Sequence, residues 1–184
     1  YLHFDDGPTP EVTEWVLAEL EKHNIKATFF CIGKNIESPP EIFSKIAASG
    51  HSIGNHTFNH LNGWKNETKT YLENFEACRK AIENTLGAKN KVKLFRPPYG
   101  KIKAAQAKEI RRKGCKIIMW DVLSADFDQT ITPEKCLQNV IDATREGSII
   151  IFHDSVKASA NLKFALPAAI AQLKEKEFCF EALT

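Results

Sequence analysis

The sequence predicts an α/β protein whose strands run parallel. Short apolar runs of strand length alternate with longer segments in which apolar residues recur at helical spacing. Such alternation requires crossover connections, which are right-handed between parallel strands. No glycine-rich phosphate loop follows a strand, so nucleotide-binding folds lose support. The pattern is compatible with an open doubly wound sheet and with a barrel.

Each expected element has a local signal. The strands are continuous apolar runs bounded by glycine, proline or charged residues, and we place them at residues 1–4, 27–32, 51–54, 92–95, 116–120, 148–152 and 178–183. Apolar stripes indicate helices through residues 12–20, 42–47, 71–86, 137–141 and 162–173, and a further helix is expected at about 104–113. Cap signals place the starts of three of them at Thr9-Pro10, Ser38-Pro39-Pro40 and Thr132-Pro133, and the second ends at Gly50. Residues 121–131 are expected to form a loop.

Length and composition favour one domain over residues 1–184. The chain is 43% hydrophobic, enough to bury a substantial core. A net charge of +2 without a basic block argues against a nucleic-acid partner. The longest apolar runs are strand-sized, so no membrane span is expected. The chain begins with Tyr1 inside an expected strand, and we therefore expect further residues upstream.

Charged and imidazole side chains collect just beyond the carboxyl ends of the expected strands. They are Asp5 and Asp6, His56 and His60, Arg96, Asp121 and Asp126, and His153 and Asp154. In a parallel barrel these ends open on one face, which is where active sites of such barrels lie. Solvated residues without a function would also populate the strand starts and the helix backs. The shared position therefore indicates a functional site.

Asp5 and Asp6 stand where the first strand meets a Gly-Pro turn. Adjacent residues of a regular strand point to opposite faces, but at a strand end the backbone turns and both can face one pocket. Two neighbouring carboxylates repel, which indicates a cation, a metal or a shifted pKa beside one of them. An Asp-Gly turn that serves only the local backbone is the alternative.

His56 and His60 have the spacing that places two imidazoles on one side of a helical turn. With one carboxylate they suit zinc or another divalent transition metal and leave positions open for water and substrate. Thr57 stands where the zincin motif has its catalytic Glu, so the general base must come from elsewhere, and Asp5 is the candidate. A structural or surface histidine pair is the alternative.

Arg96 and His153 each have two interpretations. Arg96, which precedes a Pro-Pro turn, is a surface cation or the partner that keeps Asp5 ionised. His153, which follows an apolar run, is a core histidine or a general acid oriented by a carboxylate such as Asp126. The remaining histidines are interpreted as structural, and they are His3, His23 and His51.

With these motifs in this order, the chain resembles polysaccharide deacetylases of the NodB-homology type, the fourth family of carbohydrate esterases. The resemblance runs from Phe4 to the C-terminus. The matching segments are Phe4-Asp5-Asp6-Gly7-Pro8, His56-Thr57-Phe58-Asn59-His60, Arg96-Pro97-Pro98-Tyr99-Gly100, Leu123-Ser124-Ala125-Asp126-Phe127 and Ile151-Phe152-His153-Asp154. The resemblance implies one NodB-homology domain with a distorted parallel (β/α) barrel of about seven strands, similar to a TIM barrel.

The resemblance also implies a role for each motif residue. The metal ligands would be Asp6, His56 and His60, and they would hold one divalent ion, zinc first, with cobalt or nickel as alternatives. The catalytic residues would be Asp5 as base, Arg96 orienting it, and His153 as acid tuned by Asp126. The residues around the substrate would be Tyr99, whose N–H binds the oxyanion, and Ile151, Phe127 and Pro97, which line the pocket.

The fourth motif departs from the family pattern, which commonly reads Asp-x-x-Asp-Trp. Leu123 replaces the first Asp and Phe127 replaces the Trp, whereas Asp126 keeps its position. One wall of the substrate groove is therefore altered. We expect the chemistry to survive and the glycan preference to differ.

The implied reaction is metal-dependent hydrolysis of acetyl groups on an acetylated glycan. N-acetylglucosamine units of peptidoglycan or a chitin-like glycan are the expected substrate. An O-acetyl esterase of the xylan type, a small-molecule amide hydrolase and a non-catalytic glycan-binding module are the alternatives. We expect a monomer, and the substrate class favours the cell envelope or secretion.

Overall fold

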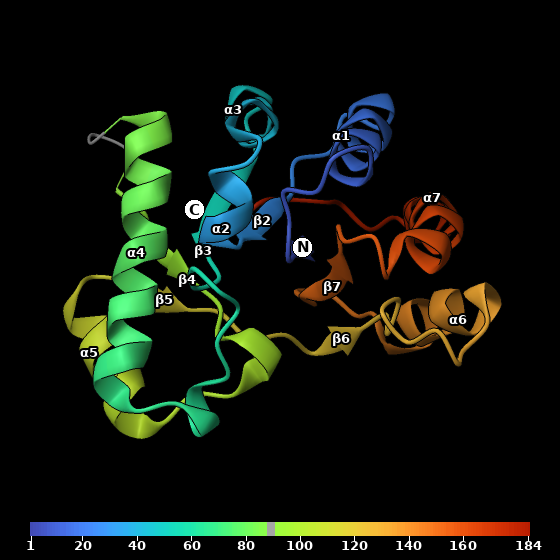
Figure 1. The fold of residues 1–184 in the computed structure, drawn as a ribbon. Coiled ribbons are helices and arrows are strands. Elements are labelled where there is room, and N and C mark those ends of the chain that lie inside the picture. Colours follow the sequence, from blue (N-terminus) through green and yellow to red (C-terminus); the bar gives the residue numbers. More distant parts are fainter. Residues whose placement is uncertain (88–90) are drawn as a thin grey trace.

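The computed structural model describes residues 1–87 and 91–184, and its strands form one curled parallel sheet (Figure 1). The strands are β1 (Leu2–Asp5), β2 (Thr28–Cys31), β3 (Ser52–Asn55), β4 (Leu94–Phe95), β5 (Lys116–Ile117), β6 (Val122–Leu123) and β7 (Ile150–His153). Their order is β5-β4-β3-β2-β1-β7-β6. The two edge strands β5 and β6 follow one another in the chain, which passes between them without pairing them. The predicted fold class, a distorted barrel of about seven parallel strands, is confirmed.

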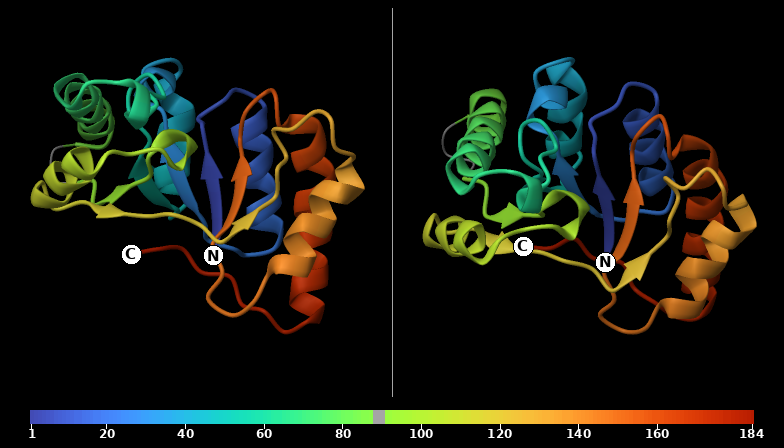
Figure 2. Two further views of the ribbon diagram at one scale, coloured as in Figure 1. Left: turned by 90° about the horizontal axis from the view of Figure 1, so that it is seen from below. Right: turned by 60° about the horizontal axis from the view of Figure 1, so that its bottom comes forward.

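Helices pack along the outer side of this sheet (Figure 2). They are α1 (Val12–Lys22), α2 (Gly33–Ile36), α3 (Pro40–Ala48), α4 (Thr68–Leu86), α5 (Ala104–Arg112), α6 (Pro133–Ala143) and α7 (Ser159–Glu175), with 3-10 turns η1 (Gly63–Lys65) and η2 (Pro98–Gly100). The short α2 was not predicted.

The central strand β1 shows how the sheet divides core from site. All four of its residues are buried, although their side chains alternate between two faces. Leu2 and Phe4 belong to the hydrophobic core, together with apolar side chains of α1 and α7. His3 and Asp5 take the other face and meet Arg96. The helices therefore cover an apolar face, and the inner face of the curl is left for polar side chains.

Two predicted strands and the predicted loop at 121–131 need correction. The expected strand at 116–120 ends at Ile117, and Val122–Leu123, inside the expected loop, forms β6 instead. Strand β6 pairs with β7 through Val122↔Ile150 and Leu123↔Ile151. The expected strand at 92–95 is shortened to Leu94–Phe95.

The apolar segment 178–183 is not a strand, although its composition predicts one. Its backbone bonds to side chains at the start of the sheet: Leu183 N–H donates to Thr28 Oγ1 at 3.0 Å, and the Ser52 hydroxyl donates to the Leu183 carbonyl. Phe178 and Phe180 pack against the core. The segment thus packs its two phenylalanines, partly buried, against the core without a ladder partner.

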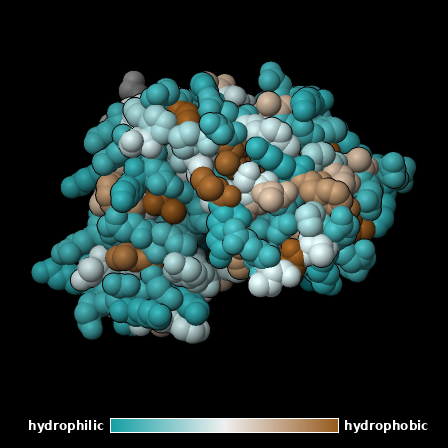
Figure 3. All heavy atoms as spheres, turned by 45° about the vertical axis from the view of Figure 1, so that its right-hand side comes forward, coloured by the Kyte–Doolittle hydropathy of each residue, from teal (hydrophilic) through white to brown (hydrophobic). Residues whose placement is uncertain are grey.

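Across the described ranges, no helix is long and apolar enough to cross a membrane. The face drawn in Figure 3 is mainly hydrophilic, and its hydrophobic side chains form small separate groups.

Candidate active site

The first motif turns at the end of β1. Asp5 is the last residue of the strand and is buried, whereas Asp6 has a φ of 81° and leaves the strand direction. The two carboxylates nevertheless face the same imidazole: Asp5 Oδ2 lies 4.0 Å and Asp6 Oδ1 lies 3.7 Å from His56 Nε2. The structure therefore places both adjacent acids at one site. Asn35 supports the turn by donating to the Asp6 carbonyl at 2.8 Å.

The segment between His56 and His60 is an irregular loop after β3, not the helical turn that the spacing predicted. Thr57 and His60 have φ values of 62° and 54°, and this left-handed backbone brings the two rings together by a different path. The ring centroids are 5.0 Å apart. The prediction of convergence thus relied on the wrong local geometry.

Two asparagines that the sequence analysis missed hold this loop. Asn55 Oδ1 accepts the Thr57 N–H at 2.8 Å. Asn74 on α4 accepts the N–H groups of Phe58 and Asn59, two of the three residues between the histidine ligand candidates, at 2.9 Å each. Asn74 belongs to the predicted helix at 71–86 but is not one of its apolar stripe residues. No local pattern in the sequence therefore identified it.

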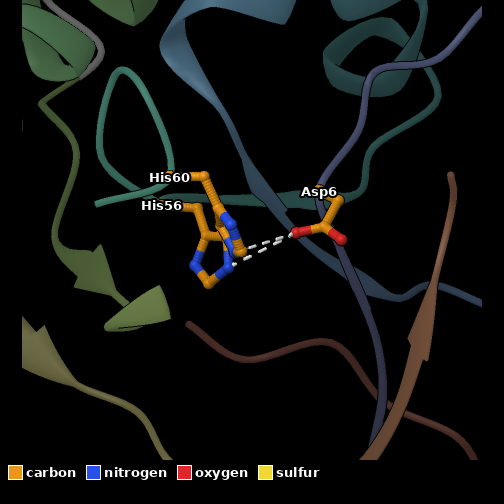
Figure 4. Close-up of side chains that lie close together, drawn as sticks. All are labelled: Asp6, His56 and His60. Carbon is orange, nitrogen blue, oxygen red and sulfur yellow. Dashed lines mark ion pairs between the residues drawn. The ribbon is translucent and has the colours of Figure 1, made fainter. Parts of the chain in front are cut away.

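Asp6, His56 and His60 form a group with the chemistry of a metal site (Figure 4). One ligand atom from each lies within 4.8 Å of the others, and Asp6 Oδ1 is 3.2 Å from His60 Nε2. The His56 Nδ1–H donates to the Arg96 carbonyl at 2.8 Å, which leaves the Nε2 lone pair facing Asp6. Within the described chain, the buried Asp6 Oδ1 accepts no hydrogen bond. These residues fit a divalent transition metal.

The protonation state of His56 and His60 is the one that metal ligands need. Burial lowers the pKa of His56, and it lowers the pKa of His60 to about 4, even though Asp5 and Asp6 act in the opposite direction. Both rings are therefore neutral at pH 7, as metal ligands must be.

Arg96 is fully buried and bonds directly to Asp5. Its NH1 group donates to Asp5 Oδ1 at 2.8 Å, and its guanidinium lies 4.2 Å from the Phe30 ring centroid. Burial raises the pKa of Asp5, but the charge and hydrogen bond of Arg96, together with the charge of His153, hold it below its ordinary value. Asp5 is thus an ionised carboxylate whose Oδ2 remains on the side of the metal-site group.

His153 ends β7 directly opposite Asp5 in the parallel register. Its Nδ1–H donates to Asp126 Oδ1 at 2.7 Å, and Asp126 Oδ2 accepts the His153 backbone N–H at 2.7 Å. Burial lowers the pKa of His153, but the hydrogen bond and charge of Asp126, with the charges of Asp5 and Asp6, raise it to about 9. At neutral pH the ring is an imidazolium. Asn161 holds the Asp126 carbonyl at 3.1 Å.

The residues expected around the substrate lie on both sides of these groups. Tyr99, 59% exposed, has its ring 4.5 Å from the His60 ring, and its backbone is left-handed with a φ of 60°. Phe127 meets the His153 ring edge-on at 5.0 Å. Ile151 and Pro97 are buried. The surface beside the site is therefore aromatic on both sides.

Asp154, the last residue of the fifth motif, supports the first. Its buried carboxyl accepts the Gly7 N–H at 3.0 Å and the Thr13 hydroxyl at 2.5 Å. Burial raises its pKa to about 8. A Cβ atom on Gly7 would lie 1.9 Å from Asp154 Oδ2, which explains why glycine follows the two acids.

Comparisons with known proteins show the family of this chain. The polysaccharide deacetylase family model matches residues 1–118, which contain the first three motifs. The chain belongs to the polysaccharide deacetylase family. A peptidoglycan-N-acetylglucosamine deacetylase of Bacillus cereus is 35% identical over 99% of this chain and 66% of its own length. A chitooligosaccharide deacetylase of Azorhizobium caulinodans is 34% identical over 84% of this chain and 72% of its own length. The chain thus spans about two thirds of these family members.

Solved structures of the family share the fold closely. The Bc1960 peptidoglycan N-acetylglucosamine deacetylase superposes with a TM-score of 0.93, at 34% identity, over 99% of this chain and 84% of that chain. A Bacillus anthracis protein described as a pseudoenzyme of carbohydrate esterase family 4 superposes with a TM-score of 0.87, at 25% identity, over 99% of this chain and 62% of that chain. The fold by itself therefore does not guarantee activity.

Proposed function

We propose that this chain is a metal-dependent hydrolase that removes the acetyl group from N-acetylglucosamine units of a polysaccharide. One observation carries the proposal. The Asp6–His56–His60 group lies beside an ionised Asp5, and the strand that ends in Asp5 pairs with the strand that ends in a protonated His153. A base, an acid and a metal-binding group are what hydrolysis of an unactivated amide needs.

The metal would be held by Asp6 Oδ1 and by the Nε2 atoms of His56 and His60. When bound, a divalent ion polarises the acetyl carbonyl and makes the attacking water more acidic. Imidazole and carboxylate ligands suit zinc, and they also accept cobalt or nickel. The Arg96 carbonyl keeps His56 in the tautomer that this role requires, because it accepts the Nδ1 proton.

Asp5 would accept the proton of the attacking water. Arg96 keeps this carboxylate ionised and fixes Oδ1, so that Oδ2 is left to act as the base. His153 would donate its proton to the leaving amine nitrogen, and Asp126 supplies both the orientation of the ring and its raised pKa. The Tyr99 N–H would donate to the carbonyl oxygen as negative charge develops there.

The relatives support the substrate class. The two curated relatives described above are named for peptidoglycan N-acetylglucosamine and for chitooligosaccharide. An O-acetyl ester would use the same residues with an easier leaving group, and a small cyclic amide would need the same base and acid. A polymeric peptidoglycan substrate would place the protein at the cell envelope or outside the cell.

A non-catalytic glycan-binding role is the second candidate, because pseudoenzymes occur on this fold. The present chain retains all three ligand candidates close together, the base candidate Asp5 bonded to Arg96, and the acid candidate His153 bonded to Asp126. That retention favours an active enzyme.

Acetate release tests the proposal. The protein is incubated with chitin oligomers, peptidoglycan fragments, acetylated xylan and small cyclic amides, each with a chelator and with zinc, cobalt or nickel restored. We expect acetate from the N-acetylated glycans only when metal is present. Binding of these glycans without acetate release under any metal would support the glycan-binding module instead.

A further inference from the structure

His3 is buried on the inner face of the sheet and contacts Arg96, which donates a hydrogen bond to the proposed base Asp5. It lies two residues before Asp5 on β1, so both side chains take the same face of the strand. His3 Nδ1 lies 2.6 Å from NH2 of Arg96, the guanidinium whose NH1 binds Asp5 at 2.8 Å. His3 is therefore linked to the base through a single side chain.

The donors of Arg96 show what His3 contributes. The Nε–H donates to the Ile118 carbonyl at 3.2 Å, and NH2 donates to the Met119 carbonyl at 3.0 Å. The other NH2 proton points at His3 Nδ1. A guanidinium has five N–H donors, and a fully buried one needs acceptors for them. His3 and Asp5 are the two side chains that accept from it in the described structure, and with the two backbone carbonyls they hold the guanidinium plane.

The contact also fixes the tautomer of His3. Because a guanidinium only donates, Nδ1 must accept and the ring proton must sit on Nε2. Burial and the charge of Arg96 lower the pKa of His3 to about 2, so the ring is neutral. His3 Nε2 is itself buried and has no hydrogen-bond partner among the residues described.

A buried donor without a partner destabilises the fold. Such local violations are expected where function requires them and are offset elsewhere in the structure. Among the described residues, the His3 ring has no other hydrogen bond and packs with its centroid 5.5 Å from that of Phe30. An apolar residue would fill this position without leaving the Nε2 proton unpaired.

We propose that His3 is a positioning residue for the catalytic base: its Nδ1 accepts from Arg96 and keeps the guanidinium turned toward Asp5. The inference rests on the proposed function only in assigning Asp5 as the base. The contact itself is independent of substrate and metal.

A pair of variants of nearly equal shape separates the acceptor from the packing. His3→Asn keeps an oxygen acceptor close to the position of Nδ1, whereas His3→Leu fills the same space without one. We expect His3→Leu to lower kcat for acetate release by about 10- to 100-fold, with KM and metal content unchanged, because the base is misplaced. We expect His3→Asn to restore kcat to within about threefold of wild type.

His51 provides the matched control. It is also buried, its Nδ1 accepts the Ala27 N–H at 3.1 Å, and its ring lies 5.2 Å from that of Phe29, but it precedes β3 at the other end of the sheet. The same two substitutions at His51 should lower Tm and leave kcat unchanged. Equal loss of kcat in His3→Leu and His3→Asn, or no loss in His3→Leu, would overturn the proposal.

Crystal structures of His3→Leu and His3→Asn give a readout that does not need activity. We expect the Arg96–Asp5 contact to be lost or rotated in the Leu variant and kept in the Asn variant. If wild type releases no acetate from any substrate, the proposed function fails, and these structures still decide the positioning role. An unchanged Arg96–Asp5 contact in His3→Leu would refute it.

Discussion

Two histidines on opposite sides of the site carry opposite protonation states. The side chains of His60 and His153 are similarly shielded, 25% and 15% exposed, and Asp5 and Asp6 raise the pKa of both. Yet the pKa of His60 is lowered to about 4 and that of His153 is raised to about 9. The difference is Asp126, whose carboxylate lies 2.7 Å from His153 Nδ1, whereas His60 has the neighbouring His56. One hydrogen-bonded carboxylate therefore decides whether an imidazole is neutral, as a metal ligand must be, or protonated, as a general acid must be.

The largest expected difference is between a variant that lacks a proposed metal ligand and one that lacks the proposed base. We expect His56→Ala to lose both bound metal and activity. Asp5→Asn should lose activity by about 10²- to 10⁴-fold while its metal content, measured by elemental analysis, stays near that of wild type. The Asn side chain is neutral and cannot accept the proton from water. If Asp5→Asn kept most of its turnover, Asp5 would not be the base.

Replacing Asp126 should lower the pKa of His153 toward the low pKa of His60. In wild type we expect kcat/KM to fall as pH rises through about 9, where His153 loses its proton. Asp126→Asn removes the charge that raises this pKa, and burial then lowers it, so the basic limb should move to lower pH. A pH profile of kcat/KM checks this. A basic limb that stays at the same pH would assign it to another group.

The same pKa predicts a stability effect in the metal-free protein. The folded pKa of His153 is raised above its unfolded value of 6.5, so its stabilisation is fully present below pH 6.5 and is lost as pH rises through about 9. Asp126→Asn should flatten this part of the dependence of the free energy of unfolding on pH. Urea titrations of both proteins between pH 6 and 10 measure it, and equal slopes would contradict the assignment.

Restoring the common family residues in the fourth motif should have the smallest effect. Leu123 is exposed at the end of β6, and Phe127 forms a T-shaped ring contact with His153. We expect Leu123→Asp with Phe127→Trp to change the ratio of kcat/KM between chitin oligomers and peptidoglycan fragments by about two- to tenfold, because an aromatic contact contributes about 1 kcal/mol. A kcat that collapses on both substrates would show that these positions serve the chemistry.

The sequence determined where the chemistry lies. Apolar runs identified the central strands, and the polar residues that follow them identified one face of a parallel sheet. Asp121 is the exception, because its strand ends at Ile117 and its carboxylate accepts hydrogen bonds from Ser148 and Ile149 just before β7. Asp6, His56 and His60 meet there, as do Asp126 and His153. These predictions succeeded because the position of a residue at a strand end can be recognised from the local sequence. A parallel sheet then brings the carboxyl ends of its strands to one face.

Tertiary structure decided what local patterns do not encode. Strand β6 has two residues and exists through its pairing with β7, whereas segment 178–183 has a strand-like composition but finds side-chain partners at Thr28 and Ser52 instead of a ladder. The contact between Arg96 and Asp5 joins residues 91 positions apart. His3 was interpreted as a structural histidine because the sequence of one strand does not show which distant side chain will contact it. Long-range packing alone placed Arg96 against it.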